Sequence, residues 1–277
     1  MTARELLQGA MKQLQQSGVD APRRDAELLL MFVWGISNTE LIIKMHDELP
    51  QDIITSFEAL LQRRLHREPL AYILGKKEFW SHDFVVTPDV LVPRPETEHL
   101  IESVLQYYPN QEGFYAFADI GTGSGCIAVT LALEYPNATV TACDISEKAL
   151  LIAKKNAERL GVAERLKFFV GDLYQALPEK NSFDLIVSNP PYVSLDEMLG
   201  LEPELAQEPR FALTDESTGL TLLEKLLMDA NKYLNEQGIL MLESGLCGMP
   251  ESPKTMKKLE DYFDLAGNFR GSVFKKL

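Results

Sequence analysis

The sequence has few cysteines, no excess of basic residues, no internal repeats and no long apolar run. Its three cysteines, Cys126, Cys143 and Cys247, lack C-x-x-C spacing, so we expect neither disulfides nor a metal site. The apolar stretch 28–34 is far too short to span a bilayer, and the N-terminus lacks the apolar core of a signal peptide. These absences predict a cytoplasmic protein without membrane association.

Acidic residues outnumber basic ones, 41 to 27, and the formal net charge at pH 7 is −14. Stable binding to nucleic acid usually needs a basic surface that neutralises phosphates, so we expect no such binding here. The chain of 277 residues has a globular composition and is long enough for one full α/β domain with a smaller companion. We therefore expect two domains and, by default, a monomer.

Residues 2 to about 74 carry apolar side chains at the spacing of amphipathic helices, which predicts an all-helical N-terminal domain, residues 1–75. Pro22 and Pro50 stand where helices would begin, and Pro69 and Gly75 are expected to mark the end of the bundle. The three predicted apolar helix faces are Leu6, Leu7, Ala10 and Leu14; Ala26, Leu29, Leu30 and Val33; and Ile53, Phe57, Leu60, Leu61 and Leu65.

Residues 76–94 change in character and form a linker in this prediction. The segments 79–86 and 90–92 have the pattern of two short strands, broken at Thr87-Pro88-Asp89. We therefore expect a β-hairpin linker between the two domains.

From residue 95 to 277, apolar strands alternate with helices. This alternation is typical of a parallel, doubly wound sheet, so we expect a Rossmann-like α/β domain. The predicted helices are 96–108, 124–134 and 146–160, and the predicted strands are 115–120, 138–144, 166–172 and 183–189.

A glycine-rich loop, 119–125, lies directly between a predicted strand and a helix. Glycines let the backbone turn sharply and let a nucleotide-like cofactor approach, so we take Gly121, Thr122, Gly123, Ser124 and Gly125 as candidate cofactor-binding residues. The same stretch with Ala128 also satisfies G-x-G-x-x-A, the dinucleotide pattern. An NAD-dependent oxidoreductase therefore stays an alternative at this point.

Two acidic residues end the next two predicted strands. Asp144 is placed to accept hydrogen bonds from the ribose hydroxyls of a cofactor, although it could instead cap the helix that starts near Ser146. Asp172 is placed at the equivalent edge of the sheet, where it could contact an adenine amino group or serve as a plain cap. Both are candidate cofactor-binding residues.

The sequence 189-NPPY-192 follows the fourth predicted strand and is the decisive motif. An amide nitrogen is a poor nucleophile because its lone pair is delocalised, so an enzyme that alkylates it must hold and orient the NH₂ group. The Asn189 side-chain oxygen and the Pro190 carbonyl can accept its two N–H bonds, while Pro190 and Pro191 make the loop rigid. Tyr192 would form a wall against a flat amide or base, or simply cover the end of the sheet.

With these motifs the chain resembles the bacterial peptide chain release factor glutamine methyltransferases. The resemblance covers nearly the whole chain and includes the segments 75-GKKEFW-80, 91-LVPRPETE-98, 119-DIGTGSG-125, 144-DIS-146 and 187-VSNPPY-192. It implies that S-adenosylmethionine is the cofactor and S-adenosylhomocysteine the product, and that no metal takes part. It also implies that class 1 release factors, methylated at the glutamine of a Gly-Gly-Gln motif, are the partners, so that the enzyme modulates translation termination.

The resemblance also assigns roles to residues. Asn189, Pro190 and Tyr192 would be catalytic, and the helical domain would help to recognise the protein substrate. The cofactor would be held by the glycine loop, Asp144, Asp172, Leu173 and Asn189, and the substrate by Asn189, Pro190, Pro191, Tyr192, Pro93, Arg94, Glu96 and Thr97. For Arg94 and Glu96 an alternative interpretation has equal weight, namely that they belong to a rigid linker and an ordinary helix start at Pro95.

The sequence departs from the family pattern at two places. Leu173 stands where some relatives carry an aromatic residue near the adenine, and 243-ESGLCGM-249 lacks the glutamine that commonly follows the Glu-x-Gly. The C-terminal region looks compressed, with a short closing strand predicted after 264–270, which leaves the last strands of the sheet unassigned.

Three other functions stay open. An amino methyltransferase acting on adenine in nucleic acid could use the same site, because the motif accepts any planar NH₂ group, but the net acidity argues against it. An NAD-dependent oxidoreductase leaves 189–192 unexplained. A non-catalytic module that binds the cofactor and docks on release factors would bind without turnover.

Overall fold

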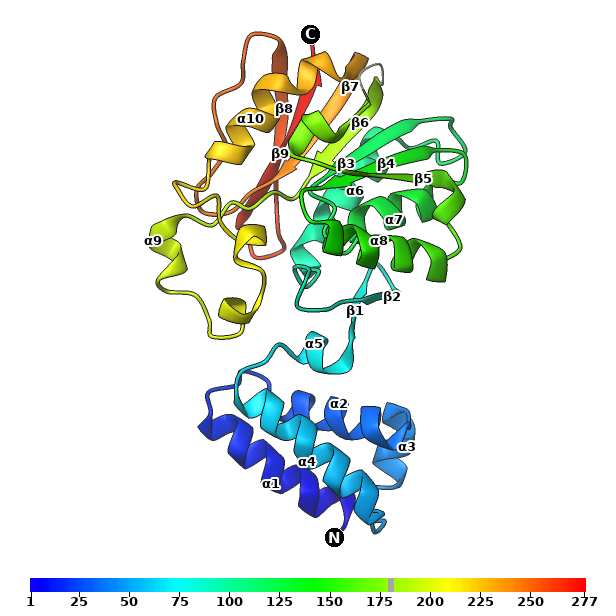
Figure 1. Cartoon of the computed structure of the whole chain (residues 1–277), viewed down its shortest axis with the longest axis vertical. Coiled ribbons are helices and arrows are strands. Elements are labelled where there is room, and N and C mark those ends of the chain that lie inside the picture. Colours follow the sequence, from blue (N-terminus) through cyan, green and yellow to red (C-terminus); the bar gives the residue numbers. More distant parts are fainter. Residues whose placement is uncertain (179–181) are drawn as a thin grey trace. The chain divides into compact units, whose positions relative to one another are not determined.

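The computed structural model describes residues 1–178 and 182–277, and Figure 1 shows their arrangement along the chain. The residues fall into two compact units. One, the helical unit, comprises Met1–Gly75 and Glu202–Gln207, and the other, the sheet unit, comprises Lys76–Leu201 and Glu208–Leu277. In the described part of the chain no helix is long and apolar enough to cross a membrane.

The helical unit contains α1 (Ala3–Gln16), α2 (Pro22–Trp34), α3 (Asn38–Ile43), α4 (Gln51–Leu65) and α5 (Leu70–Leu74). The three predicted helices are confirmed as α1, α2 and α4. Pro22 occupies the first turn of α2, and Pro50 is the N-cap of α4, as expected. Pro69 does not end the bundle, because it is the N-cap of α5, and the helical region ends only at Gly75, whose φ of 70° suits a glycine C-cap.

A short segment that is distant in sequence completes the helical unit. Glu204 accepts hydrogen bonds from Arg64 Nη1 at 2.8 Å and from Arg67 Nη2 at 2.5 Å. Arg64 is buried and also donates from Nε to Asp25 Oδ2 at 2.7 Å. No local pattern indicates this contribution, since nothing around Glu204 points to residues more than a hundred positions earlier.

The linker hairpin exists, but its strands differ from the predicted ones. β1 (Lys76–Phe79) pairs antiparallel with β2 (His82–Val85), and the turn falls at Trp80 and Ser81, with φ values of 51° and 60°. The predicted break at 87–89 and the predicted strand 90–92 are therefore wrong. A two-residue turn with both φ values positive usually carries glycine or asparagine, and neither is present to mark it. Here the backbone N–H groups of Trp80 and Ser81 donate to glutamate side chains instead.

The sheet unit is built on a seven-stranded sheet in the order β5-β4-β3-β6-β7-β9-β8. The first five strands in this order are parallel, and β9 and β8 are antiparallel additions at one edge. The bounds are β3 (Ala116–Ile120), β4 (Thr139–Asp144), β5 (Leu166–Val170), β6 (Phe183–Ser188), β7 (Leu234–Glu243), β8 (Met256–Phe263) and β9 (Phe269–Lys276). The predicted Rossmann-like, doubly wound fold is thus confirmed.

Helices cover the sheet because alternate strand residues point to opposite faces. Phe117 of β3 packs into one apolar cluster with residues of α6 and α7, whereas Ala118 packs into another with residues of α10. The helices of this unit are α6 (Glu98–Tyr107), α7 (Cys126–Glu134), α8 (Glu147–Arg159), α9 (Leu195–Met198) and α10 (Thr221–Asp229). Single 3₁₀ turns are η1 (Pro95–Thr97), η2 (Ala163–Arg165), η3 (Leu173–Ala176), η5 (Arg210–Ala212) and η6 (Ala230–Lys232), with η4 (Leu205–Gln207) in the helical unit.

Two predicted strand limits need correction. β5 ends at Val170, so Asp172 lies beyond the strand rather than at its last position. The expectation of a short closing strand is wrong, because β8 and β9 have eight residues each. Four of the eight side chains of β8 are charged and three of these are exposed, which hides the alternation by which a strand is normally recognised.

Candidate active site

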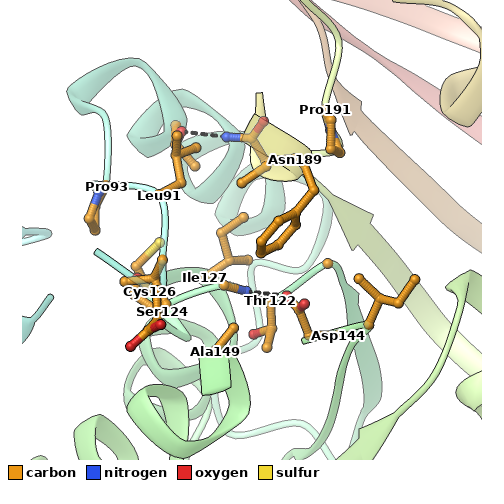
Figure 2. Close-up of a pocket in the computed structure, with 18 of the residues that line it drawn as sticks. Leu91, Pro93, Thr122, Ser124, Cys126, Ile127, Asp144, Ala149, Asn189 and Pro191 are labelled. Carbon is orange, nitrogen blue, oxygen red and sulfur yellow. Dashed lines mark hydrogen bonds between the residues drawn. The ribbon is translucent and has the colours of Figure 1, made fainter. Parts of the chain in front are cut away.

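A hollow opens at the carboxyl edge of the parallel strands, on both sides of the point where the strand order reverses between β3 and β6 (Figure 2). Ligands of doubly wound sheets bind at such a switch point. The hollow brings together most of the predicted site residues: Pro93, Arg94, Thr97, Gly121, Thr122, Gly123, Ser124, Asp144, Asp172, Leu173, Asn189 and Pro191. Four predicted residues do not line it, namely Glu96, Gly125, Pro190 and Tyr192.

The glycine loop has the conformation that its composition predicts. Gly121, Gly123 and Gly125 have φ values of 76°, 54° and 80°, in the left-handed region. A Cβ atom on Gly121 or Gly123 would meet nothing within 4 Å, so these glycines leave open space in the hollow. A Cβ atom on Gly125 would lie 2.9 Å from Cβ of Ala153. The absence of a side chain at Gly125 therefore lets the loop pack closely against α8.

A buried carboxylate fixes the conformation of the glycine loop through hydrogen bonds. It was not among the predicted site residues. Asp119, the fourth residue of β3, accepts hydrogen bonds from the Thr122 hydroxyl at 2.6 Å and from the Ala128 N–H at 3.1 Å. Burial raises the pKa of Asp119 to about 7, although the two hydrogen bonds act in the opposite direction. Its position in 119-DIGTGSG-125 is the one signal that could have identified it.

Asp144 ends β4 and faces the same loop. Its Oδ2 accepts from the Gly123 N–H at 2.8 Å, and its Oδ1 accepts from the Ser146 N–H at 2.9 Å. Burial raises the pKa of its carboxyl group, and these backbone hydrogen bonds partly offset the effect. The alternative of an N-cap is wrong, because Ser146 caps α8 with its own hydroxyl. Asp144 is thus held at the edge of the hollow with its carboxylate beside the glycine loop.

The edge next to β5 is formed by Gly171, Asp172 and Leu173. Asp172 precedes η3 but makes no side-chain capping hydrogen bond there, so the alternative of a plain cap finds no support. Its side chain is exposed, whereas Leu173 is partly buried and adopts a φ of 48°. Both side chains are therefore placed where a ligand in the hollow would pass.

Asn189 follows directly after β6. Its Nδ2 donates to Oγ1 of the buried Thr97 at 3.1 Å, the hydrogen bond drawn at Asn189 in Figure 2. The Tyr192 ring lies against Gly245, where a Cβ atom would stand 2.9 Å from its Cε2. The Tyr192 hydroxyl donates to Glu243 Oε1 at 3.2 Å. Asn189 thus borders the hollow directly, and Tyr192 packs behind it.

The segment 91–97 forms another wall. Arg94 pairs with the buried Glu208, which also accepts from the Val92 N–H at 2.9 Å. Glu96 pairs instead with Arg270 at 3.5 Å. Pro95 occupies the first turn of η1, which fits the interpretation of an ordinary helix start. Arg94 therefore both lines the hollow and ties this wall to the segment that begins at Glu208.

The hollow also contains residues that the sequence analysis did not single out. Several are apolar, and Phe211, half exposed, is the aromatic among them. Phe211 comes from η5, which carries no motif. The unassigned lining residues are Asp89, Val90, Leu91, Cys126, Ile127, Ile145, Ala149, Gly171, Phe211, Ala212 and Leu222.

Two protein families match parts of the chain. The family described as PrmC N-terminal domain matches residues 5–75, and the family described as Methyltransferase small domain matches residues 99–208. The first corresponds to the helices α1–α5, and the second contains the glycine loop, Asp144 and Asn189.

Curated relatives are similar over most of the chain. A release factor glutamine methyltransferase of Nitratidesulfovibrio vulgaris is 42% identical over 245 residues, which cover 88% of this chain and 82% of the relative. One of Neisseria gonorrhoeae is 44% identical over 225 residues, covering 81% of each chain. A bifunctional methyltransferase of Rickettsia prowazekii is 35% identical over 260 residues, covering 87% of this chain and 50% of that protein.

Solved structures of methyltransferases share the fold. A methyltransferase from Pyrococcus furiosus matches with a TM-score of 0.50 at 21% identity, covering 78% of this chain and 96% of that one. The hMettl16 catalytic domain, solved in complex with the MAT2A 3'UTR hairpin 6, matches with a TM-score of 0.55 at 17% identity, covering 78% and 81%. At these identities the likeness concerns the fold alone.

Proposed function

The chain belongs to the family of release factor glutamine methyltransferases, and from this premise we propose that it methylates the side-chain amide nitrogen of the glutamine in the Gly-Gly-Gln motif of class 1 peptide chain release factors. The enzyme is an S-adenosylmethionine-dependent methyltransferase. The observation that supports the proposed chemistry best is that one hollow contains the glycine loop, Asp144 and Asn189.

The residues of the hollow fit the cofactor. The Cβ positions of Gly121 and Gly123 face open space, so a ligand can lie against the backbone of the loop. The Asp144 carboxylate is placed to accept hydrogen bonds from ribose hydroxyls, and Asp172 and Leu173 would border the adenine. When bound, S-adenosylmethionine supplies a methyl group on a positively charged sulfur.

The protein's part in the reaction is to orient the nucleophile. The Asn189 side-chain oxygen and the Pro190 carbonyl would accept hydrogen bonds from the two N–H groups of the substrate amide. The Tyr192 ring would pack behind these two acceptors. Because methyl transfer disperses the sulfonium charge rather than creating a new one, orientation and exclusion of water contribute most. The path of the substrate is proposed to be lined by Pro93, Arg94, Glu96, Thr97 and Pro191.

Other parts of the proposal concern the whole protein. Residues 1–75 would contribute to recognition of the release factor, residues 76–94 would link them to the methyltransferase domain 95–277, and the enzyme would act in the cytoplasm as a monomer. Its effect in the cell would be to modulate translation termination. Neither a stable nucleic-acid complex nor a metal requirement is expected.

The direct experiment incubates the protein with S-adenosylmethionine and a purified release factor and, separately, with duplex DNA, followed by mass spectrometry of both. The proposal predicts a gain of about one methyl group on the glutamine of the Gly-Gly-Gln motif. Methylation confined to DNA would favour the adenine-modifying alternative, and binding of S-adenosylmethionine without turnover on either substrate would favour a non-catalytic module.

Asn189→Ala tests the orientation of the nucleophile. We expect the rate constant kcat to fall about a hundredfold or more, because the substrate amide loses an acceptor that aims its nitrogen. The thermal midpoint should change little, since Asn189 is only partly buried. The matched control is Asn137→Ala at an exposed site, which should keep full activity. Near-normal turnover of the Asn189 variant would contradict the mechanism.

Asp144→Ala tests the assignment of the ribose site. Loss of a charged acceptor is expected to raise the dissociation constant for S-adenosylmethionine, measured by calorimetry, about 10- to 100-fold. Asp229→Ala, at a half-exposed position at the end of α10, is the control. An unchanged dissociation constant for the Asp144 variant would refute the assignment.

A further inference from the structure

A fully buried carboxylate lies behind the proposed substrate site. Glu243 is the last residue of β7 and is 1% exposed. Ser188 of β6 pairs with Leu242 of β7 in the parallel sheet, so the next residues, Asn189 and Glu243, emerge side by side at the carboxyl edge. A carboxylate in such a place needs partners, because burying an isolated charge is costly.

Two hydroxyl groups serve this carboxylate. Tyr192 donates to Oε1 at 3.2 Å. Burial raises the pKa of Glu243 to about 7, and hydrogen bonding from the Thr97 and Tyr192 hydroxyls acts against this rise, as does the charge of Arg270, whereas Glu96 adds to it. Oε2 makes no hydrogen bond of regular geometry within residues 1–178 and 182–277. The Thr97 hydroxyl is the second donor to the Glu243 carboxylate.

This arrangement fixes which way round the Asn189 amide lies. A hydroxyl that gives its proton to a carboxylate can only accept from its other neighbour. Thr97 Oγ1 therefore faces the NH₂ group of Asn189, at 3.1 Å, and would be repelled by the amide oxygen. The orientation of an asparagine amide is decided by its hydrogen-bond network, and here the network places Oδ1 away from Thr97, as drawn for Asn189 in Figure 2.

We propose that Glu243 is a positioning residue for methyl transfer, which acts through Thr97 to present the Asn189 oxygen to the substrate amide and through the Tyr192 hydroxyl to fix the aromatic ring. The proposal rests on the proposed function, in which Asn189 Oδ1 is the acceptor for the nucleophile. Reversal of the Asn189 amide would present two N–H donors to the N–H groups of the substrate and would repel them.

The rival interpretation is that Glu243 and Thr97 only tie β7 to η1. The two interpretations differ for Thr97→Val, because valine has nearly the same shape as threonine but no hydroxyl. If the role is merely structural, Thr97→Val lowers the free energy of unfolding but leaves kcat of the folded enzyme at the wild-type value. If the role is positioning, kcat itself falls, since the Asn189 amide loses the acceptor that sets its orientation.

The kinetic test compares Thr97→Val, Thr97→Ser and Glu243→Gln with the wild type, using the full-length protein and a release factor. We expect kcat to fall about tenfold or more for Thr97→Val and Glu243→Gln, while the dissociation constant for S-adenosylmethionine stays within about twofold. Thr97→Ser, which restores the hydroxyl, should recover most of the loss. Thr130→Val is the matched control, because the buried Thr130 hydroxyl in α7 has no partner among the described residues.

Wild-type kcat in Thr97→Val would overturn the proposal while leaving the proposed function standing. If the wild type itself does not methylate a release factor, the proposed function fails. The hydrogen bonds that join Glu243, Thr97 and Asn189 are then tested by NMR of the Asn189 side-chain NH₂ group. Its protons should be protected from exchange in the wild type and in Thr97→Ser, and lose that protection in Thr97→Val. Equal protection in all three proteins would refute the positioning network independently of activity.

Discussion

At the scale of single residues, the aromatic wall depends on a glycine outside the recognised motif. Gly245 follows Glu243 by two positions and is the residue on which the Tyr192 ring rests. Its backbone does not need positive φ, so its small size rather than its flexibility is what the site requires. From the sequence we expected 243–249 to depart from the family pattern, and no local signal in this segment indicates a contact with Tyr192.

Gly245→Ala should therefore act on the reaction through Tyr192 alone. The new Cβ would stand 2.9 Å from the Tyr192 Cε2 atom, and such overpacking costs about 1–3 kcal/mol unless the ring moves. We expect kcat to fall about tenfold with little change in the dissociation constant for S-adenosylmethionine. Gly9→Ala, in α1 with nothing within 4 Å of its Cβ position, is the control. Full activity of the Gly245 variant would show that the ring position does not matter.

At the scale of elements, part of the site comes from a segment that carries no motif. The segment from Glu208 to Leu213 is held by the pairing of Glu208 with Arg94 and with the Val92 N–H. It brings Phe211 to the hollow. Because Phe211 is the aromatic residue among those that line the hollow, we propose it for an aromatic contact with the cofactor.

Phe211→Ala tests this element. Loss of an aromatic contact is worth about 0.5–1.5 kcal/mol, so the dissociation constant for S-adenosylmethionine should rise about 2- to 10-fold by calorimetry. Phe114→Ala, which removes an aromatic ring that is 87% exposed, should change nothing. An unchanged dissociation constant together with a raised KM for the release factor would place Phe211 on the substrate side of the hollow instead.

At the scale of the whole molecule, the two units are interleaved in sequence. Glu202–Gln207 belongs to the helical unit although it lies within the sequence of the methyltransferase domain. Burial opposes ionisation of Glu204, but hydrogen bonds from Arg67 and Arg64 outweigh it and lower the pKa of its carboxyl group. A group whose pKa is lowered by folding contributes stability above its ordinary value, and this contribution is lost as the pH falls through the folded value.

Glu204→Ala should therefore destabilise the helical unit at neutral pH. We expect the free energy of unfolding to fall by about 1–3 kcal/mol, because the buried Arg64 keeps only Asp25 and a backbone carbonyl as partners among the described residues. Hydrogen exchange of the α4 amides would measure this loss of stability. The difference in stability between the variant and the wild type should shrink below about pH 4. Glu27→Ala, which breaks a pair with the exposed Arg23, should cost less than about 0.5 kcal/mol. Equal losses of unfolding free energy in Glu204→Ala and Glu27→Ala would exclude a structural role for the inserted segment.

Local sequence patterns were enough to predict the parts of the structure that depend on neighbours along the chain. Helical spacing predicted α1, α2 and α4, strand and helix alternation predicted the doubly wound sheet, and the motifs at 119–125 and 189–192 identified the family. These inferences succeed because amphipathic periodicity and turn chemistry act over a few residues. The assignments of individual site residues stay predictions, although most of them meet in one hollow.

Which distant residues meet depends on how the elements are arranged in the folded chain. The Trp80–Ser81 turn carries no glycine, β8 hides its alternation behind polar side chains, and Phe211 has no motif around it. Glu243 reaches Tyr192 because β6 and β7 are parallel neighbours, and Glu204 completes the helical unit through arginines of α4 and the turn that follows it. Such contacts arise from sheet register and from the pairing of buried charges across long sequence separations, which no local pattern encodes.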